Sequence, residues 1–187
     1  MLKGRIPVIS VFAPVRNLRC NDSARMHESL VGTAQQRLLH GAKTLSYAFN
    51  CAVHRECDRR GVDDAILFTE DGCTLECPNS SIVVRYGDTL ITPDPRIGIL
   101  HGTSQRELFA WALQEGQHTY YKKLPFAELR EADRLYMVHG GWVIPVNELD
   151  GQTYDYDSTE IETVNTAIHT GRTHDDALAI GPSSDYE

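Results

Sequence analysis

The spacing of apolar residues changes several times along the chain, and each spacing predicts a different element. Between residues 45 and 53, apolar or small side chains recur every three or four positions, as on one helix face, and Arg59-Arg60-Gly61 is typical of a helix C-terminus. Residues 6–15 alternate loosely and include two prolines. This second pattern predicts an edge strand, followed by an irregular connection up to about Gly32.

The centre of the chain predicts short strands joined by tight turns. Apolar runs and Gly-containing turns alternate in the order 65–68, turn 70–72, 81–84, turn 86–88 and 89–92. We therefore expect a meander over this part of the chain. Further strands are expected around 118–122, at 134–138 and up to Val146, with Gly140-Gly141 between the last two.

Helical spacing returns after residue 100. Apolar residues at 108, 109, 111, 112 and 113 predict a helix that closes at Gly116 and follows directly on Gly102-Thr103-Ser104. A short helix is expected at 125–131, and a weak helical pattern lies near 160–168. Together these elements predict an α/β (α+β) fold with a sheet at its core.

Composition and charge narrow the possible partners. The 187 residues, of which 41% are hydrophobic, suffice for one domain with a buried core. The formal net charge of −8, without Lys/Arg runs between aromatics, predicts neither a nucleic-acid nor a membrane partner. No apolar run reaches the roughly 18 residues of a membrane span, and residues 1–17 lack a secretory pattern, so we expect a cytoplasmic protein.

The cysteines leave one alternative to weigh. There are five, an odd number, and Cys73 and Cys77 stand four positions apart among eight scattered histidines. A zinc site is one interpretation of this spacing. The second ligand pair of a structural zinc site is missing, so we expect reduced thiols and no metal.

Lys43 stands among small and apolar residues in the stretch HGAKTLSYAFN, 40–50. Lysines in such settings commonly lay their aliphatic stem on apolar surface and keep the ammonium in water. The functional alternative is a desolvated amine with a lowered pKa that forms a Schiff base with an aldehyde.

Three further sites also allow both a structural and a functional interpretation. Gly102-Thr103-Ser104 opens a helix and could bind phosphate or simply cap the helix. Glu76, in TLECPNSS, could be solvated or could hydrogen-bond a ring nitrogen. Gly140-Gly141, in VHGGWVIPV, could be a plain turn or could let the backbone approach a ligand closely.

Taken in order, these segments resemble one family. Residues 41–151 are similar to the large domain of the class IV (fold type IV) pyridoxal-phosphate enzymes, which include branched-chain aminotransferases, D-amino acid aminotransferases and aminodeoxychorismate lyases. The segments that carry the resemblance are GAKTLSYAFN, DDAILFTEDGCTLECPNSS, LITPDPRIGILHGTSQRELF and ADRLYMVHGGWVIPVNELDG. It implies the D-amino acid aminotransferase-like fold, a mixed sheet or pseudo-barrel with flanking helices, and a homodimer.

The resemblance also implies roles for residues. Lys43 would form the internal aldimine with pyridoxal 5'-phosphate and, once freed, act as the general base. Glu76 would keep the pyridine nitrogen protonated. The phosphate would be held by Gly102, Thr103 and Ser104, and the loop His139-Gly140 would contact phosphate and the substrate carboxylate.

The chain departs from the family pattern at several of these positions. Ser81 stands where the family has asparagine, and Val83 where it has an aromatic residue. Gln105 replaces a basic residue, and Arg106 comes one position later. His139 and Gly140 replace hydroxyl residues. These changes bear on the choice of substrate more than on the cofactor.

The front of the chain is short for this family, in which a small α/β domain precedes the lysine. We interpret 1–32 as a remnant of that domain with the interdomain linker, 33–151 as the cofactor-binding large domain, and 152–187 as a C-terminal helix with a polar tail. A fragment of a longer enzyme, a small domain supplied by another chain, and a remnant without activity all remain open.

The sequence therefore predicts a pyridoxal-phosphate enzyme. The first hypothesis is an aminodeoxychorismate lyase-like activity, which yields 4-aminobenzoate and pyruvate for folate synthesis, because GAKTLSYA is most similar to lyase-like members. The second is an aminotransferase acting on branched-chain or D-amino acids. A non-catalytic binding protein built on this fold is the alternative from another class.

Overall fold

The computed structural model describes residues 7–12, 43, 47–69 and 71–182. Its strands are β1 (Pro7–Phe12), β2 (Asp64–Phe68), β3 (Ser81–Tyr86), β4 (Thr89–Pro93), β5 (His118–Lys122), β6 (Arg134–His139), β7 (Trp142–Val146), β8 (Glu148–Leu149) and β9 (Gln152–Thr153). Its helices are α2 (Ala48–Arg60), the 3-10 turn η1 (Pro95–Ile97), α3 (Thr103–Gln114), α4 (Phe126–Leu129), α5 (Ser158–His169) and α6 (His174–Ala179).

The strands form two sheets, in the orders β2-β1-β8-β9 and β5-β4-β3-β6-β7. Each sheet contains parallel and antiparallel pairs. The expected mixed sheet with flanking helices is confirmed, and the described strands do not close into a barrel. No helix in the described part of the chain is long and apolar enough to cross a bilayer.

Two strand assignments made from the sequence were wrong. β1 is an inner strand, hydrogen-bonded to β2 and β8, and not an edge strand. Pro7 is the first residue of β1, a position at which a strand tolerates proline. The expected meander of three consecutive strands is not formed. β2 pairs with β1 in the other sheet, whereas β3 pairs with β4 and β6. An apolar run predicts a strand but does not select its partner.

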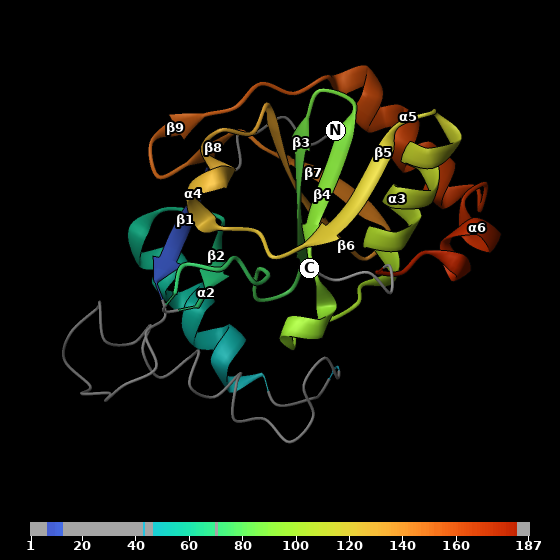
Figure 1. Cartoon of the computed structure of the whole chain (residues 1–187). Helices are drawn as coiled ribbons and strands as arrows, with labels where there is room; N and C mark the ends of the chain where they lie inside the picture. Colours follow the sequence, from blue (N-terminus) through green and yellow to red (C-terminus); the bar gives the residue numbers. More distant parts are fainter. Residues whose placement is uncertain (1–6, 13–42, 44–46, 70, 183–187) are drawn as a thin grey trace.

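The five-stranded sheet is covered on both faces (Figure 1). Along β3, Ile82 and Val84 face a cluster that includes residues of β2, α4 and β8, whereas Val83 faces α3 and α5. Figure 1 shows α3, α5 and α6 on one side of this sheet and α4, β8 and β9 on the other. Burial on both faces explains why these strands are apolar runs without polar alternation.

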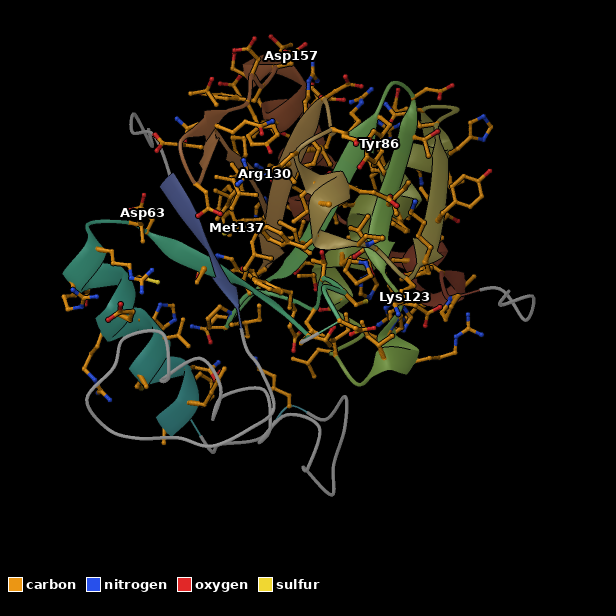
Figure 2. All side chains as sticks on the ribbon, turned by 60° about the vertical axis from the view of Figure 1, so that its left-hand side comes forward. Asp63, Tyr86, Lys123, Arg130, Met137 and Asp157 are labelled. Atoms are coloured by element: carbon orange, nitrogen blue, oxygen red, sulfur yellow. The ribbon has the colours of Figure 1, made fainter. Side chains whose placement is uncertain are left out.

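Side-chain contacts connect the five-stranded sheet to β2 and α4, which lie on the face of Ile82 and Val84 (Figure 2). Met137 of β6 packs in the same cluster as Ile66 of β2, which brings the two sheets together. Tyr86, at the end of β3, donates its hydroxyl hydrogen to the Glu128 carbonyl oxygen in α4, at 2.6 Å.

Helix α2 ends where its sequence predicts. Gly61 adopts the left-handed conformation (φ 70°), and the helix packs Val53 and Cys57 against Ala65 and Leu67 of β2. Glu56, 7% exposed, accepts hydrogen bonds from Arg59 and Arg60 one turn later. The Arg59 hydrogen bond, supported by Arg60, outweighs burial and lowers the pKa of Glu56 to about 2.

Helix α5 is fastened to the edge strand β7 through one side chain. Asn165 accepts a hydrogen bond from the Val143 N–H at 2.8 Å and donates one to the Val143 carbonyl oxygen at 3.1 Å. The Asn165 side-chain amide therefore satisfies both the backbone N–H and the carbonyl of buried Val143. These groups would otherwise lack a partner, because β7 is the edge strand of its sheet.

Glu56→Gln should remove an acid-sensitive part of the stability. Because the native pKa lies below that of the unfolded chain, the carboxylate stabilises the fold above about pH 4.5, and this contribution is lost as the pH falls towards 2. We expect the free energy of unfolding to fall by ~1 kcal/mol at pH 7, a modest change because solvent screens the exposed Arg59. Urea unfolding of wild type and variant between pH 7 and pH 3 measures this difference. The difference from wild type should shrink on acidification, and exposed Glu162→Gln should show no such trend.

Asn165→Ala should lower the free energy of unfolding by ~2 kcal/mol, because it leaves the Val143 N–H and carbonyl without their partner. Chemical denaturation tests this, with Glu162→Ala as an exposed control on the same helix. Hydrogen exchange at Val143 should speed up in the Asn165 variant. An unchanged exchange rate would contradict the proposed fastening.

Candidate active site

Helix α3 begins beside the end of the large sheet without a side-chain cap. Its N-cap is Gly102, which has extended geometry (φ −64°, ψ 134°), and no side chain bonds to the first turn as a cap. The amide hydrogens of that turn and the positive end of the helix dipole can therefore serve an anion.

A hydrogen bond joins this helix end to the β6–β7 hairpin. The Ser104 hydroxyl oxygen accepts from the Gly141 N–H at 2.8 Å, and Ser104 is 92% buried, having a relative exposure of 8%. Gly140 and Gly141 both have positive φ, 56° and 81°, which a two-residue turn between antiparallel strands requires. Segments 102–104 and 139–141, far apart in sequence, thus form one structure.

Ser81 brings a third segment to the same place. It is the first residue of β3 and pairs with Val138 of β6, directly before the hairpin. A Cβ placed on Gly102 would lie 2.8 Å from the Ser81 hydroxyl oxygen, so any larger residue at this position would displace that hydroxyl. The sequence flagged Ser81 only as a departure from the family pattern; it gave no indication that Ser81 and Gly102 would touch.

Glu76 lies next to the segment that leads into α3. It is half-buried, and its carboxylate oxygen Oε2 accepts from the Leu100 N–H at 3.3 Å. Its backbone carbonyl accepts from the Leu67 N–H at 3.0 Å, which ties Glu76 to β2. The carboxylate of Glu76 therefore contacts Leu100, which precedes Gly102 by two positions in the chain.

Lys43 is an exposed residue located five positions before α2. Residues 41, 42 and 44–46 lie outside the described residues, so the surroundings expected for a desolvated amine remain a prediction. The first turn of α2 is held to the turn after Glu76, because Asn50 donates to the Asn79 side-chain oxygen at 3.0 Å and to the Pro78 carbonyl. The helix that follows Lys43 is thus hydrogen-bonded to residues that come two and three positions after Glu76 in the chain.

The remaining predicted site residues, Thr103 and His139, are exposed. His139 closes β6 opposite Trp142, whose ring packs on His169 of α5 with centroids 4.1 Å apart. The structure therefore brings Gly102, Ser104 and Gly140 together with His139 at the hairpin and places Glu76 beside Leu100. Among the described residues, no hydrogen bond or ion pair joins Lys43 to this group.

Behind the first turn of α3 lies a buried polar group. Gln105, 2% exposed, accepts from the Tyr121 hydroxyl at 2.9 Å, and His101 bonds the same hydroxyl at 2.9 Å. Burial raises the pKa of Tyr121 to about 12 and lowers that of His101, so the group is neutral at pH 7. Among the described residues, the amide nitrogen of Gln105 has no partner.

These observations test whether a phosphate-bearing cofactor fits. A first turn without a side-chain cap, a glycine at close approach and a buried amide donor without a partner all favour an anion. Within the described residues, no cluster of three or more His, Cys, Asp or Glu side chains could hold a metal ion. The geometry fits a phosphate group.

Comparison with known proteins gives a consistent result. A curated relative, the bifunctional aminodeoxychorismate lyase / D-amino acid transaminase of Mycobacterium tuberculosis, is 38% identical over 129 residues, 65% of this chain and 45% of that protein. A fold IV-transaminase, CpuTA1 from Curtobacterium pusillum, is 33% identical with a TM-score of 0.74 over 88% of this chain and 53% of its own. The chain thus spans about half the length of these relatives.

A hypothetical aminotransferase from Mycobacterium tuberculosis, in its α-ketoglutarate- and PMP-bound form, is 29% identical with a TM-score of 0.73, covering 92% of this chain and 57% of its own. It also matches in a PLP-bound form. The sequence model described as amino-transferase class IV matches residues 11–149, most of the chain. The chain therefore belongs to the class IV aminotransferase family, whose members use pyridoxal phosphate.

Proposed function

We propose that this chain carries the cofactor site of a pyridoxal-phosphate enzyme with aminodeoxychorismate lyase-like activity. The observation that carries the proposal is the hydrogen bond from Gly141 to Ser104, which joins a helix N-terminus and a glycine hairpin into one anion-binding structure. The lyase choice is supported by the lyase-like segment GAKTLSYA and by 38% identity to a relative that bears this activity in its name.

Different residues of the chain would hold the phosphate and the ring of the cofactor. Backbone amides of Thr103 and Ser104 would donate to the phosphate oxygens, with the helix dipole opposing the negative charge. The Ser104 hydroxyl accepts from Gly141 and keeps its own hydrogen to donate. The Glu76 carboxylate would hold a proton on the cofactor ring nitrogen.

Bound pyridoxal phosphate supplies an aldehyde that bonds to amines and a ring that takes up electrons from the substrate. Lys43 would supply the amine that attaches to it. Displaced by the substrate amine, the Lys43 Nζ would be free to remove a proton from the substrate carbon, acting as general base. The exposure of Lys43 in this structure leaves the amine reachable by a substrate.

Two alternatives remain as proposals of their own. An aminotransferase acting on branched-chain or D-amino acids would use the same Lys43 and Glu76, and the relative with 38% identity is named for both lyase and transaminase activities. A non-catalytic binding protein would keep the anion site alone. A homodimer is the arrangement that the family resemblance supports, and we expect it in the cytoplasm.

We expect added pyridoxal phosphate, once the unbound cofactor has been removed, to leave the wild-type protein with a visible absorption band that Lys43→Ala lacks, because the Schiff base with this lysine holds the cofactor on the protein. Borohydride reduction followed by peptide mass spectrometry should locate the adduct on Lys43. Lys123→Ala, which removes an exposed lysine paired with Asp71, is the matched control and should keep the band. An adduct mapped elsewhere, or no band in wild type, would overturn the proposed cofactor site.

The lyase and the aminotransferase should be distinguished by their products. With 4-amino-4-deoxychorismate and no keto acid, a lyase releases pyruvate, whereas an aminotransferase converts the cofactor to its amine form and stops. We expect pyruvate release, reduced ~100-fold or more in Glu76→Gln and abolished in Lys43→Ala. Cofactor conversion by D-amino acids without pyruvate release would favour the aminotransferase. A bound cofactor with neither outcome would favour the binding protein.

A further inference from the structure

We propose that the Ser81 hydroxyl is an additional side-chain donor to the anionic group bound at the N-terminus of α3. This inference rests on the proposed function, because the anion in question is the cofactor phosphate. It assigns a binding role to a residue at which the chain departs from the family pattern.

The position of Ser81 follows from the sheet. β3 runs antiparallel to β6, and the pair Ser81–Val138 is the last one before the glycine hairpin. On the other side stands Gly102, and a Cβ added to it would lie 2.8 Å from the Ser81 hydroxyl oxygen. Ser81 therefore lies between the helix end and the hairpin, the two halves of the anion site.

The Ser81 hydroxyl is also available. Ser81 is partly exposed, and its hydroxyl has no hydrogen-bond partner among the described residues. The preceding serine, Ser80, is buried at 5% exposure, and its hydroxyl has no hydrogen-bond partner among the described residues. Neighbouring side chains of an extended segment point in opposite directions, so the two serines serve different surroundings.

The phosphate can accept more hydrogen bonds than it has oxygens. A phosphate monoester presents three strong acceptor oxygens, each of which can accept more than one hydrogen bond, so a further hydroxyl can donate beside the first-turn amides and the hydroxyls of Thr103 and Ser104. The hairpin offers no hydroxyl, because His139 and Gly140 stand at its turn. Ser81, across from the hairpin, is placed to supply a further hydroxyl donor.

Titration of the protein with pyridoxal phosphate and with pyridoxal, which lacks the phosphate, tests the proposal. Ser81→Ala should weaken pyridoxal phosphate binding about tenfold, the effect of one hydrogen bond to a charged group, and leave pyridoxal binding unchanged. Ser81→Thr, which keeps a hydroxyl, should restore most of the difference. Ser80→Ala, the matched deletion at the neighbouring serine, should not change the ratio of the two affinities.

Gly102→Ala gives an independent test through a double-mutant cycle. Its methyl group would displace the Ser81 hydroxyl without removing it, so it should also weaken pyridoxal phosphate binding selectively. In a Ser81→Ala background, the same change should cost several-fold less, because the displaced group is already gone. The dissociation constant of inorganic phosphate, obtained from its competition with pyridoxal phosphate, should rise in the Ser81→Ala protein by a factor similar to that for pyridoxal phosphate itself.

The outcomes separate this inference from the proposed function. If wild type forms the Lys43 adduct and Ser81→Ala keeps the wild-type affinity ratio, the role of Ser81 is overturned and the cofactor site stands. Fully additive effects of Gly102→Ala and Ser81→Ala would likewise overturn it. If wild type binds neither pyridoxal phosphate nor pyridoxal, the proposed function fails and the inference fails with it.

Discussion

The hydrogen bond from the Gly141 amide to the Ser104 hydroxyl connects the parts on which the candidate site depends. It spans 2.8 Å between a helix N-terminus and a hairpin that stand 37 residues apart in the chain. Each part alone is ordinary: many helices begin without a side-chain cap, and many hairpins turn on glycines. Once joined in a largely buried contact, they place the uncapped first turn of α3 and the Ser104 hydroxyl beside the glycine hairpin.

The scaffold around this contact limits how far its parts can move. Asn165 holds α5 to the backbone of β7, and the ring of Trp142 packs on His169 in the same helix. Both faces of the large sheet are filled, so β3 and β6 cannot slide without disturbing two cores. A rigid sheet with a binding loop at its end suits a site that must keep several weak donors in register.

Much of the fold could be predicted from the sequence because it is local. The C-terminus of α2 at Gly61, the strand at 81–84 and the helix beginning after Gly102 follow from spacing and turn residues within short windows. The predictions that failed concern which strands pair with one another. β1 lies inside its sheet, β2 leaves the meander, and the short strands β8 and β9 were not predicted, because strand pairing depends on residues distant in the chain.

The sequence by itself determined the family: four segments in the right order, with Lys43 and Glu76 at matching positions, identify the chain as a class IV member, and the match over residues 11–149 agrees. Only the tertiary structure decided which segments form the candidate anion site. Ser81 and Gly102 are 21 positions apart and carry no shared sequence signal, yet the pairing of β3 with β6 and the packing of α3 bring them together. Hydrophobic spacing specifies elements, whereas close approach between elements depends on the packing of the whole sheet.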